Sequence, residues 1–226
     1  MADFNQAIPK ILKSEGGYSD NRNDLGNYVC RGGKWAKRKK GGGFYCDNDI
    51  PPHFIGTNRG IAAPTLSGWR KREVSISDMR NLSEAEAIKI YKSTYWNPIG
   101  ADNITDQKKA NVLFDAYVNQ GNLIRPMLAE VLGVSESSIK YPLRDDIIGK
   151  INGDNNFVRK FVEQRETKYK QIATKPGQAG FLAGWMNRLD EFRETVTGGI
   201  SKTWKIVIGV VVIAGLGALV YGGAKK

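Results

Sequence analysis

The chain has 226 residues, 41% of them hydrophobic, which is enough for a full core in one or two domains and excludes a mainly disordered protein. Its formal net charge of +11 indicates an anionic partner, such as a nucleic acid, a lipid surface or a cell-wall polymer, or only keeps the protein soluble. No recognition helix, RNA-binding motif or basic stripe with interleaved aromatic residues is present, so no nucleic acid is expected as a partner.

The first predicted helix ends at a pair of glycines, next to an acidic residue. Its apolar face is formed at helical spacing by Phe4, Ile8, Ile11 and Leu12. Because Gly16-Gly17 ends the pattern, Glu15 is expected in the last helical turn. The partial negative charge at the C-terminal end of a helix disfavours a carboxylate, and an apolar surround would add to this effect. We therefore expect a raised pKa for Glu15, as a general acid requires.

A polar segment over residues 18–60 is predicted to form loops, because the turn-forming residues Gly, Asn and Asp recur along it. Asp24 lies in this segment, nine residues after Glu15. It could serve in catalysis or only form an Asx turn. Residues 27–56 have the character of an insertion, with a lysine-rich stretch followed by three glycines. A solvated surface loop is the simplest interpretation of this insertion, and a contact for an anionic wall polymer or an outer leaflet is the alternative.

The two cysteines, Cys30 and Cys46, bracket the glycine- and lysine-rich part of the insertion. They could form a disulfide in an oxidising compartment or remain free thiols, and the sequence favours neither state. A zinc site that also uses His53 is disfavoured, because the spacing is poor and a fourth ligand is not evident. We therefore expect no metal and no cofactor.

Apolar residues at helical spacing predict further helices downstream. One begins at Ser83, where Ser83 and Glu86 have the spacing of a capping box. The others are expected around residues 110–120, 126–132, 145–151, 157–169 and 181–192. No alternating pattern of any length predicts strands. The expected class is therefore all-α, a helical protein with at most a small hairpin in the insertion.

Residues 206–224 form an uncharged apolar run at the C-terminal end of the sequence. At about 1.5 Å per residue, a helix of this length crosses a hydrocarbon core of about 30 Å. Trp204 and Tyr221 lie near its ends, as interfacial aromatic residues do, and lysines flank both sides. A buried core helix is the alternative, but such helices are rarely apolar on all faces. We predict one transmembrane helix after a linker at 197–205, with its orientation left open.

Several separated motifs occur in a fixed order along the chain. They are Glu15-Gly16-Gly17-Tyr18, Asn23-Asp24-Leu25-Gly26, Thr57-Asn58-Arg59-Gly60-Ile61, Tyr95-Trp96-Asn97-Pro98-Ile99, Leu113-Phe114-Asp115-Ala116-Tyr117-Val118-Asn119-Gln120-Gly121 and Gly184-Trp185-Met186-Asn187-Arg188. This series resembles glycoside hydrolase family 108, the lysozyme-like peptidoglycan hydrolases of phages and some bacteria, with its adjoining peptidoglycan-binding region. In that family the threonine follows the aspartate by about five residues, whereas here the insertion separates Asp24 from Thr57.

The resemblance implies a lysozyme-like catalytic domain over residues 1–122, with the insertion at 27–56, and a helical peptidoglycan-binding-like region over 123–196. It implies Glu15 as general acid, Asp24 as the carboxylate that stabilises the oxocarbenium-like transition state or orients a water, and Thr57 as a residue that positions this water. As an alternative, Thr57 could serve only to form hydrogen bonds with the backbone. The expected sugar contacts are Tyr18, Asn58 and Asn119.

Taken together, these features predict a membrane-anchored N-acetylmuramidase, most simply a phage enzyme that opens the cell wall during entry or lysis. Its expected partners are bacterial peptidoglycan and a lipid membrane, either of a virion or of the host, and the oligomeric state is left open. Two alternatives remain. The chain could be a virion protein that binds peptidoglycan without cutting it, or a lytic transglycosylase that acts on the same substrate.

Overall fold

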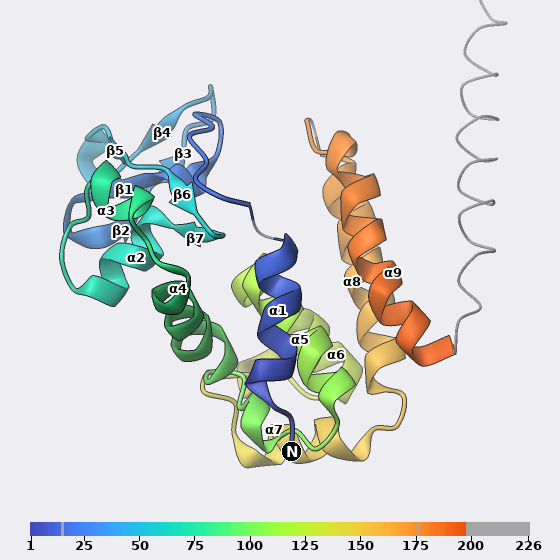
Figure 1. Ribbon diagram of the computed structural model, residues 1–226. Coiled ribbons are helices and arrows are strands. Elements are labelled where there is room, and N and C mark those ends of the chain that lie inside the picture. Colours follow the sequence, from blue (N-terminus) through green and yellow to red (C-terminus); the bar gives the residue numbers. More distant parts are fainter. Residues whose placement is uncertain (15, 176, 198–226) are drawn as a thin grey trace, which may run out of the picture. The chain divides into compact units, whose positions relative to one another are not determined.

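The computed structural model describes residues 1–14, 16–175 and 177–197 (Figure 1). The chain divides into two compact units. The first unit comprises Met1–Asn119 with Tyr141–Arg144, and the second comprises Gln120–Lys140 and the described residues from Asp145 to Thr197. Glu15 and the predicted transmembrane helix at 206–224 lie outside the described residues. Within the described ranges, no helix combines the length and the apolar character needed to cross a membrane.

Three helical elements of the first unit meet at a cluster of aromatic side chains, Phe4, Trp96 and Phe114. The helices of this unit are α1 (Phe4–Ser14), α2 (Ala63–Arg70), α3 (Ile76–Arg80), α4 (Glu84–Tyr91), a π-helical turn (Lys92–Trp96) and α5 (Gln107–Gln120). The ring of Trp96 lies 5.5 Å from that of Phe4 and 5.3 Å from that of Phe114. Trp96 is fully buried, and its indole N–H donates to Asp102 at 2.7 Å. This edge-to-face cluster joins α1 to α5 across a long stretch of sequence.

The N-terminal cap of α4 differs from the prediction, and α3 has a cap that was not predicted. Ser83 accepts a hydrogen bond from the Glu86 amide at 3.1 Å, as predicted, but the Glu86 carboxylate binds Arg70 instead of closing a capping box. A complete capping box occurs at the start of α3, where Ser75 and Asp78 bond each other's backbone amides. The Glu86 carboxylate pairs with Arg70 of α2, and it does not accept a hydrogen bond from the Ser83 amide.

Seven short strands lie between α1 and α2. They are β1 (Tyr28–Cys30), β2 (Lys34–Trp35), β3 (Lys37–Arg38), β4 (Phe44–Tyr45), β5 (His53–Phe54), β6 (Thr57–Asn58) and β7 (Ile61–Ala62). All strand pairs are antiparallel, in a three-stranded sheet β2-β1-β5 and two hairpins, β3-β4 and β6-β7. The expectation of at most one small hairpin is therefore wrong. Strands of two or three residues are too short to show alternation in the sequence.

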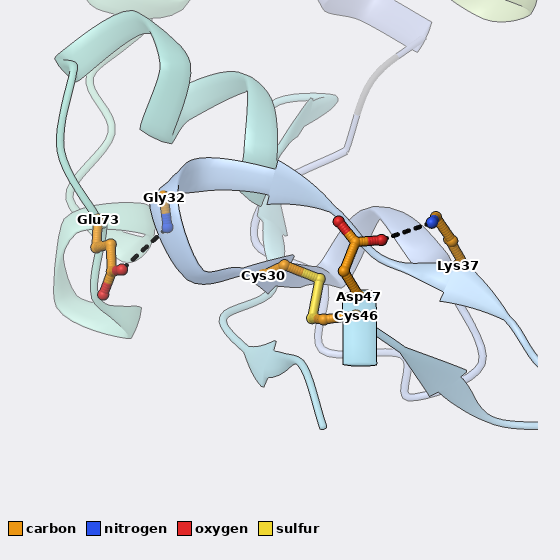
Figure 2. The surroundings of a disulfide bond; sticks show 6 residues. All are labelled: Cys30, Gly32, Lys37, Cys46, Asp47 and Glu73. Atoms are coloured by element: carbon orange, nitrogen blue, oxygen red, sulfur yellow. Dashed lines mark hydrogen bonds and ion pairs between the residues drawn. A yellow bond between two sulfur atoms is a disulfide. The ribbon is translucent and has the colours of Figure 1, made fainter. Parts of the chain in front are cut away.

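The insertion is a folded element with its own small core, not a solvated loop. Cys30 and Cys46 form a disulfide with their Cα atoms 5.6 Å apart, which decides between the two states that the sequence left open (Figure 2). Both cysteines and Ala36 are buried, and partly buried Tyr28 and Phe44 pack against them. Figure 2 also shows the Gly32 amide donating at 3.1 Å to Glu73, which follows α2. The disulfide thus crosslinks the insertion internally, and the hydrogen bond to Glu73 connects it to the segment that follows α2.

The second unit is helical, with α6 (Ile124–Leu132), α7 (Asp145–Gly153), α8 (Phe157–Ala173) and α9 (Leu182–Thr197), close to the predicted positions. The last two helices run side by side (Figure 1). Between them Arg165 is fully buried and donates to Gln120 at 2.9 Å. Trp185 is half-buried and stacks on Tyr169 with ring centroids 5.1 Å apart, in agreement with a packing role.

Candidate functional site

The two ends of the insertion meet at one residue. The carbonyl of Asn27 accepts hydrogen bonds from the amides of Ile55 at 2.8 Å and Gly56 at 3.1 Å. The next residue, Tyr28, pairs with Phe54 in the β1-β5 ladder. The intervening residues therefore loop out, and the chain resumes at Thr57 close to the point at which it departed.

Thr57 returns to the segment that follows Glu15 in the sequence. Its carbonyl accepts from the Ser19 amide at 2.7 Å, and its own amide donates to the Ser19 carbonyl at 3.0 Å. On its other side Thr57 pairs with Ala62 in the β6-β7 hairpin. Motif residues that are far apart in the sequence are thus joined through backbone hydrogen bonds.

Asp24 lies at the start of a short 3-10 turn, Leu25–Asn27, and its side chain is exposed. Its Oδ1 accepts a hydrogen bond from the Gly26 amide at 2.9 Å. The Asx turn that the sequence suggested as an alternative role is therefore present. This turn uses one lone pair of one carboxylate oxygen, so the group keeps further acceptor capacity for a water or a substrate.

Asp24 and Thr57 face a common space beside Gly26. A Cβ atom placed on Gly26 would lie 3.3 Å from Oδ1 of Asp24 and 3.6 Å from Oγ1 of Thr57, and 3.4 Å from Cβ of Ala62. Two oxygen atoms and one methyl group therefore lie around the point at which a side chain on Gly26 would begin. A carboxylate oxygen and a hydroxyl oxygen on the same side of a glycine are groups that can each bind a water molecule.

Asn27 is a site residue that the sequence did not reveal. Its side chain accepts a hydrogen bond from the Thr57 hydroxyl, and it is fully buried. In the sequence Asn27 is only the first residue of the insertion, within a loop rich in asparagine. Its link to Thr57 arises from the return of the chain, which no local pattern indicates.

Tyr18 holds the returning chain in place. Its hydroxyl donates to the Ile55 carbonyl at 3.0 Å, and the guanidinium carbon of Arg80 lies 4.6 Å from the ring centroid. A Cβ atom on Gly56 would lie 2.6 Å from the same ring, and the backbone of Gly56 has a φ of +97°. Only glycine fits this close approach without strain. The sugar contact expected for Tyr18 would use the half-buried ring, and it stays a prediction.

The two asparagines that were expected to contact sugar are engaged within the protein. Asn58 is 6% exposed, and its Nδ2 donates to the carbonyls of Met79 at 2.8 Å and Arg80 at 3.2 Å. Asn119 is exposed on α5, and its Nδ2 donates to the Asp115 carbonyl at 2.7 Å. Asn58 therefore fastens the β6-β7 hairpin to the end of α3. The role of both residues as sugar contacts stays a prediction.

An ion-pair cluster fixes α3, to which Asn58 is attached. Arg70 contacts Asp78 at 2.8 Å and Glu86 at 2.7 Å, and Arg72 contacts Asp78 at 2.6 Å. Hydrogen bonds from Arg72 and Ser75 hold the pKa of Asp78 well below its usual range. A hydrogen bond from Arg70 likewise lowers the pKa of Glu86. Both carboxyl groups are ionised near neutral pH and are unsuited to donate a proton.

Comparisons with known proteins agree with the motifs. The family model for glycosyl hydrolase 108 matches residues 8–121, a range that contains Asp24, Thr57 and the insertion. The chain is also similar to a solved structure described as that of Brucella abortus SagA, with a TM-score of 0.62 and 22% sequence identity over 88% of this chain and 95% of that chain. At this identity the likeness concerns the fold. No curated protein matches the chain. The chain belongs to the glycosyl hydrolase 108 family of peptidoglycan hydrolases.

Proposed function

We propose that the chain is an N-acetylmuramidase, which hydrolyses the β-1,4 bond between N-acetylmuramic acid and N-acetylglucosamine in peptidoglycan. The observation that carries this proposal is the space beside Gly26 that Asp24 and Thr57 share. Hydrolysis needs a water held near a carboxylate, and Oδ1 of Asp24 and Oγ1 of Thr57 on this side of Gly26 are groups that can hold one. Family membership supplies the substrate class, since the family acts on cell-wall peptidoglycan.

In the proposed mechanism Glu15 donates its proton to the leaving glycosidic oxygen. Positive charge then develops at the anomeric carbon and the ring oxygen, and the Asp24 carboxylate stabilises it. A water bound by Asp24 and Thr57 adds to the anomeric carbon and releases one proton to a carboxylate. The products are two glycan ends that together contain the elements of one water molecule.

Substitution of the acid tests the proposal directly. For Glu15→Gln we expect kcat on purified peptidoglycan to fall by about 10²- to 10⁴-fold, because the amide cannot donate a proton to the leaving group. Release of reducing ends measures the rate. The matched control is Glu136→Gln, since Glu136 is exposed in the second unit and its side chain is not part of the proposed site. Clearing of cell wall at an unchanged rate by Glu15→Gln would contradict the assignment.

The products separate hydrolysis from the transglycosylase reaction. Mass spectrometry of the released muropeptides should show reducing N-acetylmuramic acid ends, each heavier by one water than the 1,6-anhydro form. A majority of 1,6-anhydro ends would instead identify a lytic transglycosylase. Absence of any cleavage by the unaltered chain, together with retention on peptidoglycan, would favour a binding protein without catalytic activity.

We also propose that the enzyme acts from a membrane, in a virion or in a host bacterium, as a phage enzyme of entry or lysis. The support is the uncharged run at 206–224 with Trp204 and Tyr221 near its ends. The Cys30–Cys46 disulfide gives independent support for a location outside the reducing cytosol, where such bonds form and persist.

A further inference from the structure

We propose that Asn27 is a positioning residue that fixes the direction of the Thr57 hydroxyl, so that Thr57 acts only as a hydrogen-bond acceptor toward the attacking water. This inference rests on the proposed muramidase function and adds a residue to its machinery. It concerns a side chain that belongs to no motif recognised in the sequence.

The position of Asn27 is determined by its backbone and its side chain together. Its amide donates to the Asp24 carbonyl at 3.2 Å, and its carbonyl accepts from the amides of Ile55 and Gly56. The residue is completely buried, so water does not compete for its side chain. Asn27 thus connects the turn that carries Asp24 to the segment that carries Thr57.

The hydrogen bonds of the Asn27 amide define which of its ends faces Thr57. Nδ2 donates to the carbonyl of Asn21 at 2.8 Å, a bond that the amide oxygen could not make. The oxygen Oδ1 is consequently the atom turned toward Thr57, and it accepts the hydrogen of the Thr57 hydroxyl. A rotated amide would place a carbonyl oxygen against the Asn21 carbonyl and leave the buried Nδ2 against the hydroxyl.

This arrangement restricts what Thr57 can do. A threonine hydroxyl has one hydrogen, and once it is donated to Asn27 only the oxygen lone pairs remain for other partners. The two polar groups on this side of Gly26, Oγ1 of Thr57 and the carboxylate of Asp24, are therefore both acceptors. A water that donates one hydrogen to each acceptor has its own lone pair left for the anomeric carbon. Were the Thr57 hydroxyl free to rotate, it could donate to that lone pair and block the attack.

A double-mutant cycle on the full-length chain tests this role, with Asn27→Ala, Thr57→Val and the pair of changes together. Soluble glycan strands are the substrate, and the release of reducing ends gives kcat and KM separately. For Asn27→Ala we expect kcat to fall about 10- to 100-fold with KM within about twofold, because the water is misdirected while the sugar contacts remain. In the Thr57→Val background the same change should alter kcat by less than about threefold.

The conservative change Thr57→Ser provides the rescue arm. It keeps the hydroxyl, so the dependence of kcat on Asn27 should return in this background. The matched control for an asparagine-to-alanine change is Asn155→Ala, because Asn155 is exposed in the second unit. Circular dichroism melts establish that each variant is folded at the assay temperature, and Asn27→Ser replaces Asn27→Ala in the cycle if the alanine variant is not.

The outcomes distinguish this inference from the proposed function. If Asn27→Ala lowers kcat by the same factor with and without the Thr57 hydroxyl, Asn27 acts through general stability and the inference is overturned, while the muramidase proposal stands. If Thr57→Val alone keeps the full kcat, Thr57 does not position the water, and the proposed role of Thr57 fails together with the inference. Loss of the Asn27 effect in Thr57→Val and its return in Thr57→Ser support the inference.

Discussion

The space between Asp24 and Thr57 depends on the absence of a side chain at Gly26. A Cβ atom at this position would lie 3.3 Å from Oδ1 of Asp24 and 3.6 Å from Oγ1 of Thr57, so a side chain there would crowd a water bound to either oxygen. The backbone of Gly26 is not in the left-handed region, so an alanine could adopt the same conformation. An alanine at this position therefore tests the effect of a methyl group near the two oxygen atoms without straining the backbone.

For Gly26→Ala we expect kcat to fall about tenfold or more, because the methyl group competes with the water, while the melting temperature changes by only a few degrees. Steady-state rates on soluble glycan and a thermal melt are the two measurements. Gly41→Ala is the matched control, since a Cβ there meets nothing within 4 Å. An alanine variant with unaltered kcat would show that the space beside Gly26 is not used in catalysis.

The motif residues could be predicted from the sequence, but their connections could not. Glu15, Asp24 and Thr57 are recognisable by residue type and order along the chain, even with the insertion between the last two. Asn27 depends on a hydrogen bond to a residue thirty positions away, which no local periodicity encodes. The side-chain amides of Asn58 and Asn119 donate to nearby carbonyls, which the sequence did not indicate, and their role as sugar contacts stays a prediction.

At the scale of elements, the insertion is closed at its base, where the chain leaves and returns. Hydrogen bonds at Asn27 close its base, the β1-β5 pairing continues from there, and the disulfide lies beyond that pairing. A long loop with its ends fixed adds little entropic cost to the rest of the fold. This explains how Thr57 can lie far from Asp24 in the sequence and still share a space with it.

The pH dependence of stability should reveal the ion-pair cluster that holds α3. The folded pKa of Asp78 is lowered, so its contribution is complete above the unfolded pKa of about 4 and is lost as the pH falls through the lower, folded value. Asp78→Asn should therefore lower the free energy of unfolding at pH 7 by on the order of 1–3 kcal/mol. Below about pH 4 the difference between wild type and variant should shrink.

Urea denaturation at several pH values measures this difference. The control is Asp49→Asn, because Asp49 is exposed and its contact with Lys39 is 3.5 Å long, so its loss should have little effect at any pH. A constant gap between Asp78→Asn and wild type from pH 7 to pH 3 would mean that ionisation of Asp78 does not stabilise the fold.

Element length explains which parts of the fold could be predicted. The helices α5 and α8, with 14 and 17 residues, repeat their apolar face several times and are found where the sequence placed them. The five residues of α3 and the two-residue strands contain too few repeats for any pattern to emerge. Their formation depends on tertiary partners, such as the Arg70 side chain and the disulfide.

At the scale of the whole molecule, the residues of the proposed site that the structure describes belong to the first unit. The second unit has its own core around Arg165, and its expected affinity for peptidoglycan stays a prediction. The net charge of +11 suits the anionic cell-wall substrate and the membrane location that are proposed for the chain. Catalysis and membrane attachment should therefore be separable by truncation after the second unit.

A chain that ends at Thr197 retains both units and lacks the apolar run at 206–224. We expect it to remain in the supernatant after ultracentrifugation and to cleave isolated peptidoglycan with a kcat within about twofold of the full-length chain, since no group of the proposed site is removed. The full-length chain should sediment with lipid vesicles and resist extraction by high salt, because burial of an apolar helix, unlike surface charge attraction, is not screened. Release of the full-length chain by salt alone would indicate that its basic surface, and not the run at 206–224, holds it at the membrane. A folded truncated chain without activity would place residues beyond Thr197 within the catalytic unit.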